Sequence, residues 1–191
     1  MWPFEIERLW SRQEVLNTPS IVPREPGAYA WYFRQIPPRV PVDNCHTHEG
    51  HTCLYVGISP KEPPKNGAPA SRQKLFDRIR YHYRGNAAGS TLRLTLGCLL
   101  SERLGIQLRH VGGGNRMTFA EGEGRLSQWM EENAFVVWVV NSKPWLLEKE
   151  LIGEHSLPLN LDMNSEHQFH SELSQIRRDA RRRARELPIV P

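Results

Sequence analysis

The sequence predicts a mixed α/β fold in which a small sheet is covered by helices. Three segments have strand character: residues 27–33 and 52–58 are rich in aromatic and β-branched side chains, and residues 134–140 form a continuous apolar run. Most of the remaining chain carries helical periodicity or helix caps. With 191 residues, 39% of them hydrophobic and 24% charged, the chain is long enough to form one domain with its own core.

The elements before the second strand alternate with proline-rich connections. Residues 4–16 predict a short helix, and three prolines then extend the chain into the first strand: Pro19, Pro23 and Pro26. Prolines followed by a polar His/Gly stretch indicate a long hairpin insertion over residues 34–52. The composition of residues 59–70 indicates a loop.

The middle of the chain contains several helix signals. Ser71 is expected to cap a helix over residues 72–84, and Ser90 a helix that ends at Gly105. Residues 106–111 predict a short strand, followed by a glycine turn. Thr118 and Glu121 then form a capping box for the next helix.

Two further helices follow the strand at residues 134–140. Pro144 suits the first turn of a helix that runs to about residue 155. Residues 169–186 predict a basic helix, with its arginines at three- and four-residue spacing along one face and its apolar side docked on the domain.

The charge is unevenly distributed, although the net charge is only +4. Residues 72–116 and the C-terminal tail are basic, whereas residues 117–166 are mainly acidic. Segregated basic surface is typical of proteins that bind polyanions, and solvated helix faces without a partner are the alternative. No apolar run is long enough to span a bilayer, and three cysteines do not indicate a disulfide framework, so we expect no membrane partner and a cytoplasmic location.

Glu148 is the strongest single candidate for a chemical role. Its neighbours at helical spacing are apolar, and a carboxylate in an apolar stripe is costly unless it is paired or binds a metal ion. Glu150 is expected to be solvated on the other side of the helix. An arginine partner is the alternative explanation for Glu148.

Two further pairs complete the candidate site. Arg78 and His82 are four residues apart and share one helix face, where Arg can hold phosphate oxygens and His can orient a nucleophile or accept its proton. Tyr29 and Tyr55 are strand residues, each near a glycine that permits close approach of another group. A polar helix face and core aromatics are the alternatives.

Taken together, these motifs resemble those of GIY-YIG nucleases. Gly27-Ala28-Tyr29 and Tyr55-Val56-Gly57 correspond to the two sequence motifs of that family, with Ala28 in place of isoleucine. The segment from Leu75 to His82 resembles its arginine helix, and Glu148 followed by Asn160 resembles its glutamate helix and closing asparagine.

The resemblance implies a three-stranded, mostly antiparallel sheet flanked by helices, and a metal-dependent endonuclease acting on double-stranded or branched DNA. It implies Mg²⁺ (or Mn²⁺) on Glu148, and catalytic roles for the motif side chains: Tyr29, Tyr55, Arg78, His82, Glu148 and Asn160. It covers residues 26–161, with insertions and flanking segments at about 34–52, 59–70 and 86–133, an N-terminal extension at 1–25 packed on the domain, and a basic C-terminal helix within 162–191.

We expect nucleic acid to contact a further set of arginines from the basic segments: Arg80, Arg84, Arg93, Arg177, Arg178, Arg181, Arg182 and Arg185. Two alternatives to the enzyme are a catalytically silent nucleic-acid-binding module and a protein-interaction domain. The insertion also holds five potential zinc ligands without CxxC spacing, for which a polar hairpin tip is the preferred interpretation: Cys45, His46, His48, His51 and Cys53.

Overall fold

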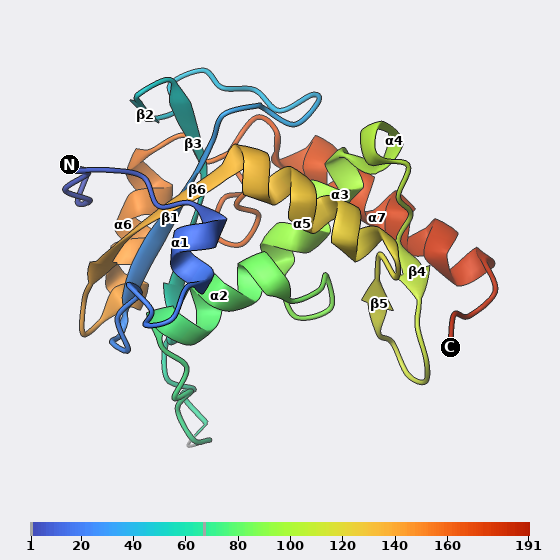
Figure 1. The fold of residues 1–191 in the computed structure, drawn as a ribbon, viewed down its shortest axis with the longest axis horizontal. Helices are drawn as coiled ribbons and strands as arrows, with labels where there is room; N and C mark the ends of the chain where they lie inside the picture. Colours follow the sequence, from blue (N-terminus) through green and yellow to red (C-terminus); the bar gives the residue numbers. More distant parts are fainter. Residues whose placement is uncertain (1, 67) are drawn as a thin grey trace.

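A four-stranded antiparallel sheet forms one end of the molecule, and most of the helices extend from it (Figure 1). The computed structural model describes residues 2–66 and 68–191. Met1, in the predicted N-terminal extension, and Gly67, in the predicted loop 59–70, lie outside the described residues. The mixed α/β class predicted from the sequence is confirmed.

The sheet has the order β2-β3-β1-β6. Its long strands are β1 (Gly27–Phe33), β3 (His51–Ser59) and β6 (Ala134–Val140), at the three predicted positions. The short β2 (Thr47–His48) pairs only with the start of β3, so the predicted three strands are the main body of the sheet.

Strand β1 lies at the centre and all seven of its residues are buried. Because side chains alternate along a strand, Tyr29, Trp31 and Phe33 join the core under the helices α2 and α5. Ala28 and Tyr32 belong to a smaller core on the opposite face, which α6 covers. The sheet is therefore covered on both faces, and its buried strands can hold catalytic side chains in fixed positions.

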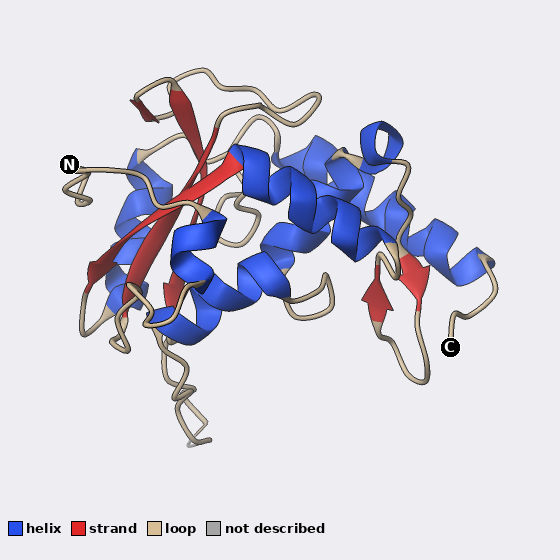
Figure 2. Cartoon of the chain, viewed as in Figure 1, coloured by secondary structure: helices blue, strands red, loops and turns tan. Residues whose placement is uncertain are grey.

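Most of the helices lie to one side of the sheet, whereas α6 lies on the other (Figures 1 and 2). The helices are α1 (Arg12–Leu16), α2 (Leu75–Arg84), α3 (Thr91–Leu99), α4 (Ser101–Leu104), α5 (Gly122–Asn133), α6 (Pro144–Glu154) and α7 (His170–Glu186). A small hairpin of β4 (Arg109–His110) and β5 (Met117–Thr118) lies beside α7. Among the described residues, none of the helices combines the length and apolar character needed to cross a membrane.

Three of the predicted helix starts are wrong. The predicted helix over residues 4–16 is reduced to α1, because Trp10 instead forms an antiparallel bridge with Val136 and Ser11 caps the helix. The Ser71 hydroxyl accepts from Gln73 N, and α2 begins only at Leu75.

The third wrong helix start is that of α5. Thr118 belongs to β5, and its hydroxyl accepts a hydrogen bond from Ala120 N, so no capping box forms with Glu121. The predicted strand over residues 106–111 is limited to β4. Ser90 does cap α3, but the predicted continuous helix to Gly105 is divided into α3 and α4 at Leu100.

Candidate active site

A cavity of about 1090 Å³ opens between the sheet, α6, α7 and the loop that follows β3. Five of the six predicted catalytic residues line it: Tyr29, Tyr55, Arg78, Glu148 and Asn160. These residues come from β1, β3, α2, α6 and the segment after α6, so the fold brings together positions that are up to 131 apart in the sequence (160 − 29 = 131).

The two tyrosines lie on the same face of neighbouring strands. Tyr29 pairs with Gly57, and a Cβ atom at Gly57 would lie 2.5 Å from Tyr29 Oη. Glycine is therefore required here, because only its lack of a side chain leaves room for the tyrosine ring. Tyr55 lies two residues from Gly57 in a regular register and pairs with Trp31, so strand alternation places it on this same face.

Tyr29 is held by a buried histidine. A hydrogen bond of 2.9 Å joins Tyr29 Oη and His82 Nε2, and His82 has no exposed surface. Burial raises the pKa of Tyr29 to about 12, and the neighbouring Arg78 guanidinium opposes this rise. Burial also lowers the pKa of His82 well below its ordinary value, aided by Arg78 and Arg93, so the imidazole is neutral at neutral pH.

Arg78 is oriented by the loop between α2 and α3. Its Nη1 donates to Gly89 O at 2.8 Å, and its guanidinium lines the cavity beside Tyr29. One edge of the planar group is thus fixed by the backbone, which leaves further N–H donors of the same group to bind an anion.

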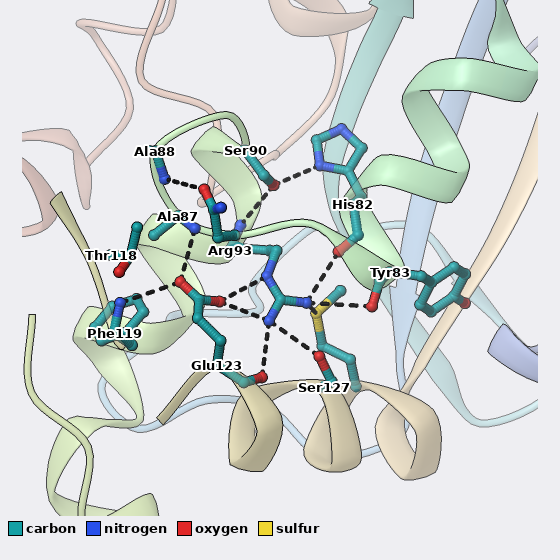
Figure 3. A network of polar contacts seen from close by, with 12 residues as sticks. His82, Tyr83, Ala87, Ala88, Ser90, Arg93, Thr118, Phe119, Glu123 and Ser127 are labelled. Atoms are coloured by element: carbon teal, nitrogen blue, oxygen red, sulfur yellow. Dashed lines mark hydrogen bonds and ion pairs between the residues drawn. The ribbon is translucent and has the colours of Figure 1, made fainter. Parts of the chain in front are cut away.

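That loop is fastened by a buried ion pair (Figure 3). Arg93 Nη2 lies 2.7 Å from Glu123 Oε2, and the same guanidinium donates to His82 O and Tyr83 O at the end of α2. Glu123 Oε1 accepts from Ala87 N within the loop. The pair therefore ties α5 to the backbone that positions Arg78 and His82.

Glu148 is half-buried and its side chain faces the cavity, whereas Glu150 is exposed. Burial raises the pKa of Glu148 to about 7; Lys61 lowers it and Asp162 raises it. Among the described residues Glu148 forms no salt bridge, which removes the arginine-paired alternative for that part of the chain.

These properties fit a divalent cation. A desolvated carboxylate that has no salt-bridge partner among the described residues gains from a nearby cation, and Mg²⁺ commonly binds through one or two carboxylates together with water and substrate phosphate. Glu148 provides the first carboxylate, and Asp162 is a second acidic group in the same cavity.

Asn160 supports the strand that carries Tyr55. Its Oδ1 accepts from Val56 N and its Nδ2 donates to Val56 O, both at 2.9 Å. The backbone of Asn160 is in turn fixed because Asn164 Nδ2 donates to its carbonyl. These bonds hold the segment after α6 against β3, so Asn160 positions the site rather than entering the chemistry.

The arginines of α7 separate into two sets. Arg177, Arg181 and Arg185 are spaced four residues apart and line the cavity. In contrast, Arg178 donates to Gln175 and Arg182 pairs with Asp179, both outside the cavity. The prediction of one shared arginine face is corrected accordingly, whereas the predicted docking of the apolar side is confirmed because Leu173 and Ala184 are buried.

Two predicted nucleic-acid contacts are contradicted by burial. Arg93 has no exposed surface and is occupied by Glu123. Arg80 is 8% exposed, and its Nη1 donates to Val15 O. Arg84 is exposed but does not line the cavity. The clustering of basic residues in the sequence could not distinguish these internal arginines from surface ones.

The Cys/His insertion forms a hairpin of β2 and β3, as preferred from the sequence, with His48 in β2 and His51 and Cys53 in β3. Glu49 and Gly50 have positive φ at its tip. His46 Nδ1 is hydrogen bonded to Tyr32 Oη at 2.8 Å, and Cys45 Sγ donates to Ser156 Oγ. Within residues 2–66 and 68–191, no group of three or more His, Cys, Asp or Glu side chains could hold a metal ion.

Several cavity residues were not predicted from the sequence. Asp162 follows Asn160 by two positions, and this proximity is a signal that could have identified it. Lys61 and Arg116 lie in a loop and a turn whose position next to the site depends on tertiary packing. Ser90 was predicted as a helix cap, but its contact with His82 was not.

Comparison with known protein families gives one result that covers most of the chain. The family model of the GIY-YIG catalytic domain matches residues 27–179, which include every predicted catalytic residue and the first part of α7. No curated protein and no solved structure matches the chain. The match supports a nuclease-type function with a nucleic-acid substrate.

Proposed function

Because the chain belongs to the GIY-YIG catalytic domain family, we propose that it is a metal-dependent endonuclease that hydrolyses phosphodiester bonds in double-stranded or branched DNA. We also propose a cytoplasmic location, which is supported by the three free cysteines. The observation that carries the enzymatic proposal is the convergence of Tyr29, Arg78 and Glu148 on one cavity.

The proposed metal ion is Mg²⁺ or Mn²⁺, and Glu148 would hold it. When bound, such an ion supplies Lewis-acid stabilisation of the charge that develops on phosphate and leaving oxygens. Arg78 binds a non-bridging phosphate oxygen through the N–H groups that Gly89 leaves available. The substrate phosphate would thus lie between the Arg78 guanidinium and the cation that Glu148 would hold.

Tyr29 and Tyr55 act on the attacking water. Tyr29 Oη orients the water, while His82 holds the phenol in place from behind. Because burial raises the pKa of Tyr29 to about 12, the phenol is protonated at neutral pH, and it accepts the proton of the attacking water as it releases its own proton to solvent in the cavity. Burial raises the pKa of Tyr55 even further than that of Tyr29, so Tyr55 stays protonated and orients the water by hydrogen bonding. Asn160 keeps β3 in register with this arrangement.

The test is cleavage by the purified protein. Plasmid, branched DNA and RNA are incubated with Mg²⁺, with Mn²⁺ and with EDTA, and the product ends are mapped. The proposal requires DNA cleavage that depends on the cation and leaves 5′-phosphate and 3′-hydroxyl ends. Binding of DNA without cleavage under all conditions would instead indicate the catalytically silent module.

Arg78→Lys is expected to lower kcat by about 10- to 100-fold. Lysine keeps the charge but lacks the planar fork that can bind Gly89 O and phosphate at once. Single-turnover cleavage at saturating enzyme measures the effect. Arg84→Lys is the matched control, because Arg84 lies on the same helix and does not line the cavity; equal activity of the two variants would remove the proposed phosphate contact.

Replacing Arg181 and Arg185 together with Gln is expected to weaken DNA binding about tenfold at low salt, and to reduce the slope of log K against log salt concentration by about 2. Both arginines line the cavity, where they can reach the phosphate backbone on either side of the cleaved bond. Turnover at saturating substrate should survive, since the proposed catalytic groups precede α7. Fluorescence anisotropy at several salt concentrations provides the measurement.

The matched control for this pair is Arg178→Gln with Arg182→Gln. It removes the same charge from the same helix but leaves the cavity unchanged, because these side chains bind Gln175 and Asp179. If both double variants lose affinity equally, α7 acts only through its overall charge and the cavity set has no special role.

A further inference from the structure

Ser90 connects the cap of α3 to the histidine behind Tyr29. The residue is 1% exposed. Its Oγ accepts from Arg93 N at 3.1 Å, which is the capping bond, and lies 2.7 Å from His82 Nδ1 (Figure 3). On the other side of the imidazole, Nε2 lies 2.9 Å from Tyr29 Oη. One buried chain of hydrogen bonds thus links the helix cap to the proposed catalytic phenol.

The direction of these bonds follows from counting protons. The bond from Arg93 N uses the Ser90 oxygen as an acceptor, so the hydroxyl proton still needs an acceptor of its own. Among the described residues, the only other hydrogen-bond partner of Ser90 Oγ is His82 Nδ1. A buried hydroxyl that leaves its proton unpaired loses free energy, so the proton points at Nδ1. A neutral imidazole carries a single N–H, which must then be on Nε2.

We propose that Ser90 is a positioning residue, which fixes the His82 tautomer so that Nε2–H donates to Tyr29 Oη. This inference deepens the proposed nuclease function and its importance for catalysis depends on that function. With Nε2–H as donor, the proton of Tyr29 is free to point into the cavity. When the phenol oxygen accumulates negative charge, it keeps a hydrogen-bond donor in place. With the opposite tautomer, Tyr29 would donate to His82 and this support would be absent.

The tautomer can be measured directly, without any assay of cleavage. In protein labelled with ¹⁵N-histidine, a protonated and an unprotonated ring nitrogen give separate NMR signals, and His82→Gln identifies the signals of residue 82. At neutral pH the wild-type protein should show a protonated Nε2 and an unprotonated Nδ1. A protonated Nδ1 would overturn the proposal.

Ser90→Asn and Ser90→Asp form a matched pair of variants. Both residues are good helix caps and have nearly the same shape, so both can accept from Arg93 N. Only Asn can also donate to His82 Nδ1, because an ionised carboxylate has no proton to give. We expect Asn to keep the wild-type tautomer and Asp to move the proton to Nδ1. We also expect kcat to remain within about threefold of wild type for Asn and to fall at least tenfold for Asp.

The outcomes separate this inference from the proposed function. If the expected tautomers are found in a protein that cleaves no nucleic acid, the role of Ser90 is supported and the proposed nuclease function is rejected. The same tautomer in Asn and Asp variants would remove the role of Ser90, whatever the protein cleaves. If neither variant folds, the wild-type measurement still decides, because it requires only His82→Gln for signal assignment and no change at Ser90.

Discussion

Glu148→Gln is expected to abolish cleavage, with kcat reduced by at least about 10³-fold, while the affinity for DNA changes little. The amide preserves the size of the side chain but lacks the charge proposed to hold the metal ion. Glu148 is the half-buried carboxylate of the cavity and forms no salt bridge among the described residues; Lys61 lowers its pKa but does not pair with it. Single-turnover cleavage and equilibrium binding, measured in parallel, separate the two effects.

The control for this prediction is Glu150→Gln. Glu150 lies on the same helix and has the same chemistry, but it is exposed. Its replacement should leave cleavage near the wild-type rate. Loss of cleavage in Glu150→Gln with retention in Glu148→Gln would assign the metal to the opposite side of α6.

Glu148→Gln should also change stability, in a direction set by its pKa. Burial raises the pKa of Glu148 in the folded protein from 4.5 to about 7, so the folded state binds this proton more tightly than the unfolded chain does. The resulting stabilisation is present below pH 4.5 and is lost as the pH rises through about 7. Relative to wild type, the variant should therefore gain on the order of 1–3 kcal/mol in unfolding free energy between acidic pH and pH 8.

Mg²⁺ provides a second stability measurement. A cation that binds the folded protein through Glu148 raises the melting temperature of the wild type, but not that of Glu148→Gln. A similar shift in both proteins would place the ion elsewhere. Because these measurements require no substrate, they test the proposed metal ligand even if the preferred nucleic acid is unknown.

The sequence predicted those parts of the fold that depend on local patterns. The three long strands follow from aromatic and apolar runs, and α6 from Pro144 at its first turn. The orientation of Glu148 relative to Glu150 follows from helical spacing alone. The predicted catalytic set could be assembled because most of its members lie within such elements: Tyr29 in β1, Tyr55 in β3, Arg78 and His82 in α2, and Glu148 in α6.

Other features depend on contacts between distant segments. Trp10 pairs with Val136, which is 126 residues away (136 − 10 = 126), and this bridge replaces the helix that the local sequence favours. Arginine is usually exposed, and the local sequence of α3 gives no reason to expect otherwise for Arg93, yet its side chain is completely buried. Its partner Glu123 lies 30 residues further along. No local pattern identifies such a pair, since the cost of burial is offset only by the tertiary fold.

Glu123→Gln is expected to lower the unfolding free energy by about 3–5 kcal/mol. Two nitrogens of the Arg93 guanidinium, Nε and Nη2, contact Glu123 Oε2 at 3.0 and 2.7 Å. Without the carboxylate, the arginine charge remains buried and uncompensated, and an amide cannot accept all the bonds that Glu123 receives from Arg93, Ala87 and Phe119. Urea unfolding monitored by tryptophan fluorescence measures the loss.

An exposed ion pair between another glutamate of α5 and Arg12 of α1 supplies the control for this prediction. Glu131 lies 3.1 Å from Arg12, and its side chain is 52% exposed. Removing an exposed ion pair costs at most about 1 kcal/mol, so Glu131→Gln should be nearly neutral. Equal losses in both variants would show that Arg93 tolerates the loss of its partner. A larger loss in Glu123→Gln, together with a fall in cleavage by the molecules that remain folded, would show that the loop from Gly85 to Ser90 depends on this pair to hold Arg78 and His82 in place.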